Sequence, residues 1–483
     1  RGVMQWGSGS LVQDSWRDTL GLLWRIAVAT ILTAFLIKPL NIMSLGDTQA
    51  ESAGIPVKKI RLLSLAVAAF LSEGVVGFVG MMGFVGLAAA TLVRQMGVRT
   101  LSMRLICSFI VGALLLMLTD NGLMLLKHYR GTDLPAGAVT ALVGAPLLLW
   151  LTAKAPPRPS FQTTSDISTA APHVPRLLRF LLLIAIAVSV LAFTVGRYDE
   201  TLRLTIDPEY FVFRYPRVLL AAATGTMLAL TGVILQRLTQ NPMAGPELLG
   251  ISSGTAFGAM SVVMLFGITS GSGWFWLTGI VSALVSLGLL MLFNRKNGFT
   301  PEKILLTGMA LAALADAAIR IWMATGDFRV QLLLLWMSGS TYQATPESAL
   351  TVGLLAAVSL LLILTLQRWL GLLSLNATIA RSVGINIPLA RLVLIVSSAA
   401  LTALSTLLIG PLSFVGLLAP HLARMLGARL PKQQLAAAAL IGASVMMTAD
   451  WLGRQVMFPY EVPAGMMATL IGGAYFMMMM RKL

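Results

Sequence analysis

Charged side chains are scarce in this chain. Asp, Glu, Lys and Arg together make up 11% of its 483 residues, whereas soluble domains contain about 25%. Hydrophobic residues account for 57%, which leaves too few polar side chains to cover a soluble protein of this size. The same apolar composition excludes a disordered chain. The shortage of charge therefore predicts a polytopic membrane protein.

Cysteine and histidine are also rare. The single cysteine, Cys107, excludes an internal disulfide and a cysteine-based metal cluster. The three histidines are far apart in the chain and have no metal-ligand spacing. The sequence Gly-x-x-x-x-Gly-Lys-Ser/Thr, which binds nucleotide phosphates, does not occur. We predict no metal site, no catalytic residue and no cofactor bound by this chain, and we expect any ATP to be used by partner subunits.

The charges that are present are mostly basic, with 35 Lys and Arg against 19 Asp and Glu and a net charge of +16. A basic soluble domain would suggest nucleic acid. In a membrane protein, however, Lys and Arg collect in cytoplasmic loops, and no run of five basic residues occurs. We predict a lipid bilayer as partner and no nucleic acid.

Apolar runs of about 20 residues, the length that crosses a bilayer as a helix, dominate the sequence. An outer-membrane barrel would instead alternate every second residue. Fifteen candidate spans can be drawn, of which 83–96 and 413–427 are short. We predict an all-α transmembrane helical bundle.

One polar stretch divides these spans. Residues 154–177 are rich in Pro, Ser and Thr, a linker composition. About five spans lie before it, in 1–153, and about ten after it, in 178–483. When the start of the second region is placed in the cytoplasm, Lys and Arg predominate on that side, as in cytoplasmic loops. The linker is then cytoplasmic too.

The two regions repeat each other. Three pairs of short segments have similar residues in the same order: Phe84–Leu87 with Phe414–Leu417, Ser52–Ile55 with Ser382–Ile385, and Leu134–Gly137 with Val462–Gly465. The first two pairs are 330 residues apart and the third is 328 apart, so the register holds with one two-residue gap. We predict tandem ten-span repeats related by a pseudo-two-fold axis along the membrane normal, the first represented here only by its last five spans.

Several motifs of the second region resemble one family. They are Arg214–Arg217, Asn241–Pro246, Phe414–His421, Ala449–Asp450 and Glu461–Gly465, in that order. In sequence and spacing they resemble the permease subunits of bacterial ABC importers for iron–siderophores and vitamin B12. Two fused copies resemble the ferric hydroxamate (ferrichrome) type of these permeases. The resemblance implies an inner-membrane permease, two cytoplasmic ATPase subunits, a periplasmic substrate-binding protein and a ferric siderophore as cargo.

The family also suggests which loops contact the ATPases. In it, a long cytoplasmic loop forms short helices that dock on the ATPase subunits. Here that loop contains coupling segment 2, and its register partner in the first copy is coupling segment 1. Coupling segment 1 is Ala50, Glu51, Ser52, Ala53 and Gly54, and coupling segment 2 is Ala380, Arg381, Ser382, Val383 and Gly384. An ordinary solvated loop is the alternative interpretation.

A second motif lies between two spans on the predicted cytoplasmic side. Proline removes a backbone donor and glycine permits unusual dihedral angles, so the motif predicts a sharp turn. The predicted structural turn or gate consists of Asn241, Pro242, Gly245, Pro246 and Gly250. Turn geometry alone would explain these residues, and a contribution to the cytoplasmic gate is the functional alternative.

Three arginines fall on the predicted periplasmic side: Arg214, Arg217 and Arg454. By resemblance, such arginines receive carboxylates of the substrate-binding protein, and guanidinium suits that role because it is always charged and forks to two oxygens. The alternative is an internal ion pair, for example of Arg454 with Asp450 one helical turn earlier. In the first copy Met124 stands where Arg454 would be, so docking need not be symmetric.

The functional expectation is a permease that moves its cargo without covalent chemistry. ATP hydrolysis by partner subunits would tilt the two repeats and alternate access to an axial pathway. The rival is an ion-coupled secondary transporter, which needs an ion site near the bilayer midplane. Cobalamin and haem remain alternative cargoes of an ABC permease.

Overall fold

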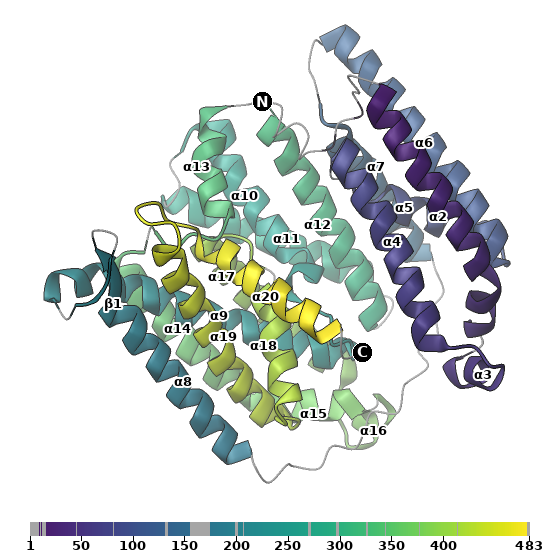
Figure 1. The fold of residues 1–483 in the computed structure, drawn as a ribbon. Helices are drawn as coiled ribbons and strands as arrows, with labels where there is room; N and C mark the ends of the chain where they lie inside the picture. The colour runs from purple at the N-terminus through teal and green to yellow at the C-terminus, as the bar shows by residue number, and fades with distance from the viewer. Residues whose placement is uncertain are drawn as a thin grey trace. The chain divides into compact units, whose positions relative to one another are not determined.

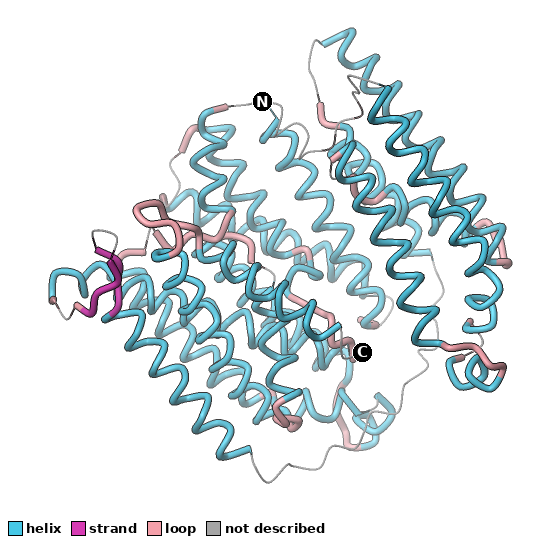
Figure 2. Tube along the Cα trace, viewed as in Figure 1, coloured by secondary structure: helices cyan, strands magenta, loops and turns pink. Residues whose placement is uncertain are grey.

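The computed structural model is almost entirely helical (Figures 1 and 2). It describes residues 9, 11, 16–44, 46–80, 82–130, 134–154, 174–198, 201–205, 207–268, 272–295, 299–324, 327–342, 344–375, 377–412 and 414–480. By their internal contacts the residues form two units, 1–154 with 316–327, and 155–315 with 328–483. Most of the predicted linker, 155–173, lies outside the described residues.

The first unit consists mainly of consecutive helices. They are α2 (Trp16–Met43), α3 (Asp47–Ser52), α4 (Val57–Val79), α5 (Val85–Gln95), α6 (Leu101–Arg130) and α7 (Ala136–Lys154). Helices α2 and α4 pack against each other around the buried side chains of Ala29, Leu36 and Val67. Most large apolar side chains of α6 are exposed, as expected of a helix that faces lipid.

The second unit begins with one long helix and a hairpin, then continues as helices. Its elements are α8 (Val174–Thr194), β1 (Val195–Tyr198), β2 (Thr201–Leu204), α9 (Pro208–Thr239), the 3-10 helix η1 (Pro246–Leu249), α10 (Ile251–Phe266), α11 (Gly273–Asn294), α12 (Pro301–Ala324), α13 (Phe328–Met337), α14 (Pro346–Thr365), α15 (Gln367–Leu375), α16 (Ala377–Ser382), α17 (Ile387–Ile409), α18 (Phe414–Met425), α19 (Pro431–Gln455) and α20 (Ala464–Met480). The part of α12 from residue 316 onward groups with the first unit. The two strands pair antiparallel, with Val195 opposite Leu204.

All fifteen predicted spans coincide with helices, although not all are long. Ten helices of the described chain are long and apolar enough to cross a membrane. The other five predicted spans correspond to α5, α7, α10, α18 and α20. The prediction of an all-α fold missed the hairpin, which has only four residues in each strand. The apolar pattern gave no separate signal for α13, α15 and α16, although the family resemblance implied short helices in the loop that contains α16.

Helix α9 is the centre of the second unit. In its apolar stretch 83% of the residues are buried, against 17% in α8 and 22% in α14. It packs on α14, α17, α18 and α19. The side chain of Asp207 caps its first turn by accepting a hydrogen bond from the amide of Glu209. Because lipid is as apolar as the side chains, close contact rather than water exclusion holds such helices together.

Glycine makes that close contact possible where α9 crosses α18 and α19. A Cβ added to Gly225 would lie 2.2 Å from the carbonyl oxygen of Gly442, and one added to Gly232 would lie 1.7 Å from that of Gly416. Real atoms do not approach so closely, so only glycine lets these backbones touch. The central position of α9 therefore depends on two crossings between glycines.

Candidate functional site

A buried carboxylate joins two of the predicted docking arginines. Asp450 in α19 has a side chain that is 0% exposed, and its oxygens lie 3.4 Å from Arg217 Nη2 and 3.1 Å from Arg454 Nη2. The hydroxyl of Thr341 donates a hydrogen bond to the same carboxylate. Arg217 also pairs with Glu461 at 2.9 Å. The structure thus contains the internal ion pair that was the alternative to docking, and extends it to both arginines.

The third arginine holds the end of α8. Arg214 Nη1 donates to the carbonyl of Phe193 at 2.7 Å, and Arg454 Nη2 donates to that of Ala192 at 3.2 Å. The indole of Trp451 donates to the carbonyl of Val195, where the hairpin starts. Side chains of α9 and α19 therefore satisfy carbonyls that the last turn of a helix leaves unpaired. The sequence had predicted the arginines but offered no sign of these carbonyl partners.

The predicted turn forms a wedge between two helices. Asn241 Oδ1 accepts a hydrogen bond from the amide of Met243, which closes the turn. Gly250 ends η1 with a φ of 71°. A Cβ on Gly416 of α18 would meet the ring of Pro246, and one on Gly308 of α12 would meet the carbonyl oxygen of Leu248. The turn therefore packs closely against α18 and α12. A side chain on Gly416 or Gly308 would clash with the turn, and Gly250 has a positive φ.

One carboxyl group of this wedge is largely buried and forms no ion pair with the residues that the structure describes. Burial raises the pKa of Glu247 to about 7. Within the described part of the chain its Oε2 has no hydrogen-bond partner. Nothing in the sequence motif distinguished this glutamate from a solvated turn residue.

The two coupling segments have the same local structure. In coupling segment 1 the side chain of Ala50 is buried and residues 51–54 are exposed, and in coupling segment 2 the side chain of Ala380 is buried and residues 381–384 are exposed. Each segment ends a six-residue helix, α3 or α16. Each closes with the same pair of backbone hydrogen bonds, from the glycine and from the isoleucine that follows it. Both segments therefore present four consecutive exposed residues on a short helix end.

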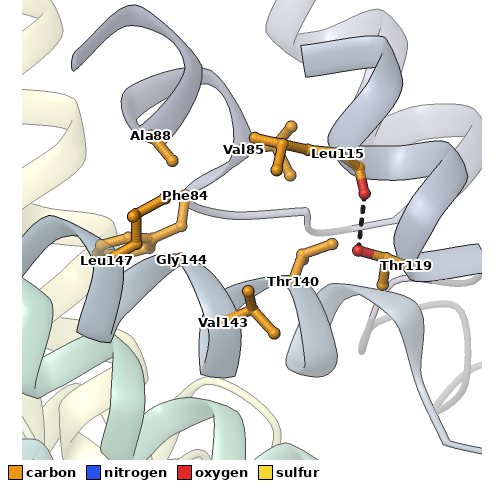
Figure 3. Close-up of a pocket in the computed structure, with 9 residues that line it drawn as sticks. All are labelled: Phe84, Val85, Ala88, Leu115, Thr119, Thr140, Val143, Gly144 and Leu147. Atoms are coloured by element: carbon orange, nitrogen blue, oxygen red, sulfur yellow. Dashed lines mark hydrogen bonds between the residues drawn. The ribbon is translucent and has the colours of Figure 1, made fainter. Parts of the chain in front are cut away.

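A small, mostly apolar pocket lies in the first unit (Figure 3). It is lined by residues of α5, α6 and α7 and by Phe84, which precedes α5. Its two hydroxyls bond within their own helices, Thr119 to the carbonyl of Leu115 and Thr140 to that of Gly137. The pocket thus offers few groups that could bind a polar ligand. No group of three His, Cys, Asp or Glu residues able to hold a metal occurs in the described residues.

Taken together, these features define a class of protein. Long apolar helices surround one buried helix, while the polar clusters lie at helix ends and turns. This is the arrangement of a multi-pass membrane protein of the transporter type. The chain belongs to the FecCD transport family, whose profile matches residues 1–154 and 177–482.

Named relatives agree with this assignment. The chain is 38% identical to the iron(3+)-hydroxamate import system permease protein FhuB of Escherichia coli (strain K12) over 99% of its own length and 73% of that protein. It is 33% identical to the hemin transport system permease protein HmuU of Yersinia pestis over 63% of its length and 95% of that protein. A solved inward-facing metal-chelate type ABC transporter matches with a TM-score of 0.58 and 28% identity, over 64% of this chain and 100% of that one.

Proposed function

We propose that this chain is the permease subunit of a binding-protein-dependent ABC importer that moves a ferric siderophore across the bacterial inner membrane. The observation that carries the proposal is the similarity to the iron(3+)-hydroxamate permeases, which extends over 99% of the chain. Ferric hydroxamate is accordingly the proposed cargo. The ten helices of membrane-spanning type supply the path, and ATP is used by partner subunits.

Two ten-span copies form the proposed pathway, the first of them represented by its last five spans. Helices α3 and α16 begin and end 330 positions apart, and so do α4 and α17. Four pairs of glycines at this spacing share a positive φ: Gly9 and Gly339, Gly54 and Gly384, Gly80 and Gly410, and Gly97 and Gly427. A repeated backbone pattern of this kind supports a pseudo-two-fold axis along the membrane normal.

One helix crossing differs between the two copies. In the second unit Gly416 of α18 lies against the backbone of α9 at Gly232. Gly86, the counterpart of Gly416, has nothing within 4 Å of an added Cβ. Among the described residues, therefore, no helix covers α5 at Gly86 in the way that α9 covers α18 at Gly416.

ATP-driven uptake is the test of the proposed function. In proteoliposomes that contain the permease, its two ATPase subunits and its binding protein, we expect ATP to drive uptake of labelled ferrichrome, a ferric hydroxamate. Uptake driven by a proton gradient in the absence of the ATPase subunits would instead establish an ion-coupled transporter. Competition by unlabelled haemin and cobalamin decides the cargo, and we expect neither to reduce ferrichrome uptake by more than about twofold.

The coupling segments are the proposed ATPase contacts. Both are exposed helix ends of matching shape, one in each copy, as two ATPase subunits require. They differ chemically, because Glu51 of segment 1 corresponds to Arg381 of segment 2. The two ATPase contacts therefore need not be chemically identical. The Asn241–Gly250 turn, next to the end of α9, is the proposed gate.

The docking surface for the binding protein remains at Arg214, Arg217 and Arg454 in this proposal. A docking carboxylate would have to compete with Asp450 for Arg217 and Arg454. Reversal of either charge would also disturb this internal cluster. Arg214 is the probe of choice, since it donates to the carbonyl of Phe193 and lies over the ring of Tyr210.

We expect Arg214→Glu to weaken binding of the substrate-loaded binding protein at least tenfold at low salt, and less at high salt, because a carboxylate there repels the acidic docking groups. Titration of the binding protein against permease complexes in nanodiscs measures this. Arg424→Glu, an exposed change in α18 at the opposite end of the helices, is the control and should bind normally. Equal affinity of Arg214→Glu and wild type would remove Arg214 from the docking surface.

A further inference from the structure

The last turn of α9 is tied to α15, the helix that precedes coupling segment 2. Gln240 Nε2 donates a hydrogen bond to the carbonyl of Ser374 at 3.2 Å. Arg237 Nη1 lies 3.5 Å from the hydroxyl of the same serine. Two side chains at the end of α9 thus contact Ser374 of α15. Gln240 contacts its backbone carbonyl and Arg237 contacts its hydroxyl.

The rest of the Arg237 guanidinium is anchored elsewhere in the second unit. Its Nε donates to Gln434 Oε1 in α19 at 2.6 Å, and its Nη2 donates to the carbonyl of Arg429. Gln434 in turn donates to the carbonyl of Pro420 inside α18 at 3.2 Å. The three nitrogens of the Arg237 guanidinium therefore contact three different structural elements. The guanidinium suits this role because it is planar and rigid.

Helix α15 is well placed to pass on movement of coupling segment 2. It packs against α16, which contains that segment, as well as against α9 and α19. The side chains of Leu370 and Leu373 are buried, and Figure 1 shows α15 next to α16. On the other side of the link, the chain runs from Gln240 directly into the Asn241–Gly250 turn.

We propose that Arg237 and Gln240 are positioning residues that transmit displacement of coupling segment 2 through Ser374 to α9 and the turn that follows it. This inference rests on the proposed ABC importer function. Because α9 is the most buried of the long helices described, a displacement of its end reaches α17, α18 and α19 together. If the contacts of Arg237 and Gln240 with Ser374 are lost, ATP is still hydrolysed but its hydrolysis no longer drives transport.

The decisive measurement is cargo imported per ATP hydrolysed in the complete complex. In Arg237→Met with Gln240→Asn we expect uptake to fall at least tenfold while the ATPase rate stays within about twofold of wild type. Methionine keeps the length and packing of the arginine stem without its donors. Wild-type uptake per ATP in this double variant overturns the proposal. So does a parallel fall of uptake and ATPase rate, since that reports a general structural defect.

A single variant covers the case in which the double variant does not assemble. Gln240 has a φ of 51°, a left-handed conformation that asparagine adopts readily. Gln240→Asn therefore keeps the backbone but withdraws the amide from Ser374, and we expect about a threefold fall in uptake per ATP. No change in that ratio would contradict the link.

The matched control is Arg179→Met. Arg179 is an exposed arginine near the start of α8 on the same side of the unit, and its helix packs mainly against α19 and α9. It should retain wild-type uptake per ATP. Uncoupling by this variant too would show that positive charge, and not the link, is what matters. Failure of the wild-type complex to import with ATP would instead refute the proposed function itself.

Discussion

Gly232→Ala is expected to prevent stable folding of the second unit, although it adds only one methyl group. The new Cβ would lie 1.7 Å from the carbonyl oxygen of Gly416 and 2.8 Å from the ring of Pro420. Neither the backbone nor the proline ring can rotate away, so α9 and α18 must separate. Overpacking of a close-packed interior costs about 1–3 kcal/mol and at times more, and a backbone clash belongs at the upper end, at about 3 kcal/mol or more.

The fraction of protein that remains monodisperse in detergent after heating measures this effect. Gly288→Ala in α11 is the matched control, because that glycine is exposed and an added Cβ meets nothing within 4 Å. Alanine favours a helix over glycine by about 0.5–1 kcal/mol, so the control should be slightly stabilised. Opposite signs for the same chemical change would confirm that the contact between helices is responsible. Similar behaviour of the two variants would contradict the proposed crossing.

Asp450→Leu is the second change with a large expected effect. It leaves the guanidinium groups of Arg217 and Arg454 in a buried site without their shared carboxylate. Breaking a buried ion pair by removing one partner costs about 3–5 kcal/mol. Here two cations lose one anion, and the hydroxyl of Thr341 loses its acceptor. We expect the free energy of unfolding to fall by an amount in that range. In the heating assay this should appear as a clearly smaller monodisperse fraction than for wild type.

Two variants calibrate this result. Glu461→Gln removes a carboxylate that is 40% exposed, so we expect a loss within about 1 kcal/mol, as for surface ion pairs. Asp120→Leu changes the register partner of Asp450 in the first unit, where the structure shows no ion pair of Asp120 among the described residues. It should have little effect. Comparable losses in Asp450→Leu and Asp120→Leu would mean that the arginines do not depend on Asp450.

Local patterns were sufficient to predict the fifteen apolar helices and the family. Each of the fifteen apolar runs coincides with a helix, because a bilayer demands continuous apolar stretches and satisfied backbone hydrogen bonds. The Asn241–Pro246 motif predicted a turn, since proline and glycine restrict the backbone wherever they occur. The short hairpin was missed because four residues per strand, next to a long apolar helix, carry too little periodic signal.

The partners of the site residues could not be predicted in this way. The sequence suggested that Arg454 could pair with Asp450, because four positions along a helix are neighbours. It could not show that Arg217, more than two hundred positions earlier, shares that carboxylate, or that Arg237 reaches α15 and α19 at once. Such contacts join distant parts of the chain, and spacing in the sequence does not encode them.

The amino-acid sequence by itself thus determined that this protein is a multi-pass helical membrane protein of the FecCD transport family, because span length, composition and turn residues act locally. Only the tertiary structure decided which helix is central, which glycines are indispensable and which charges neutralise one another. The physical reason is that close helix crossings and buried ion pairs gain their energy from partners brought together in space. That energy depends on how the helices pack, and no single segment contains it.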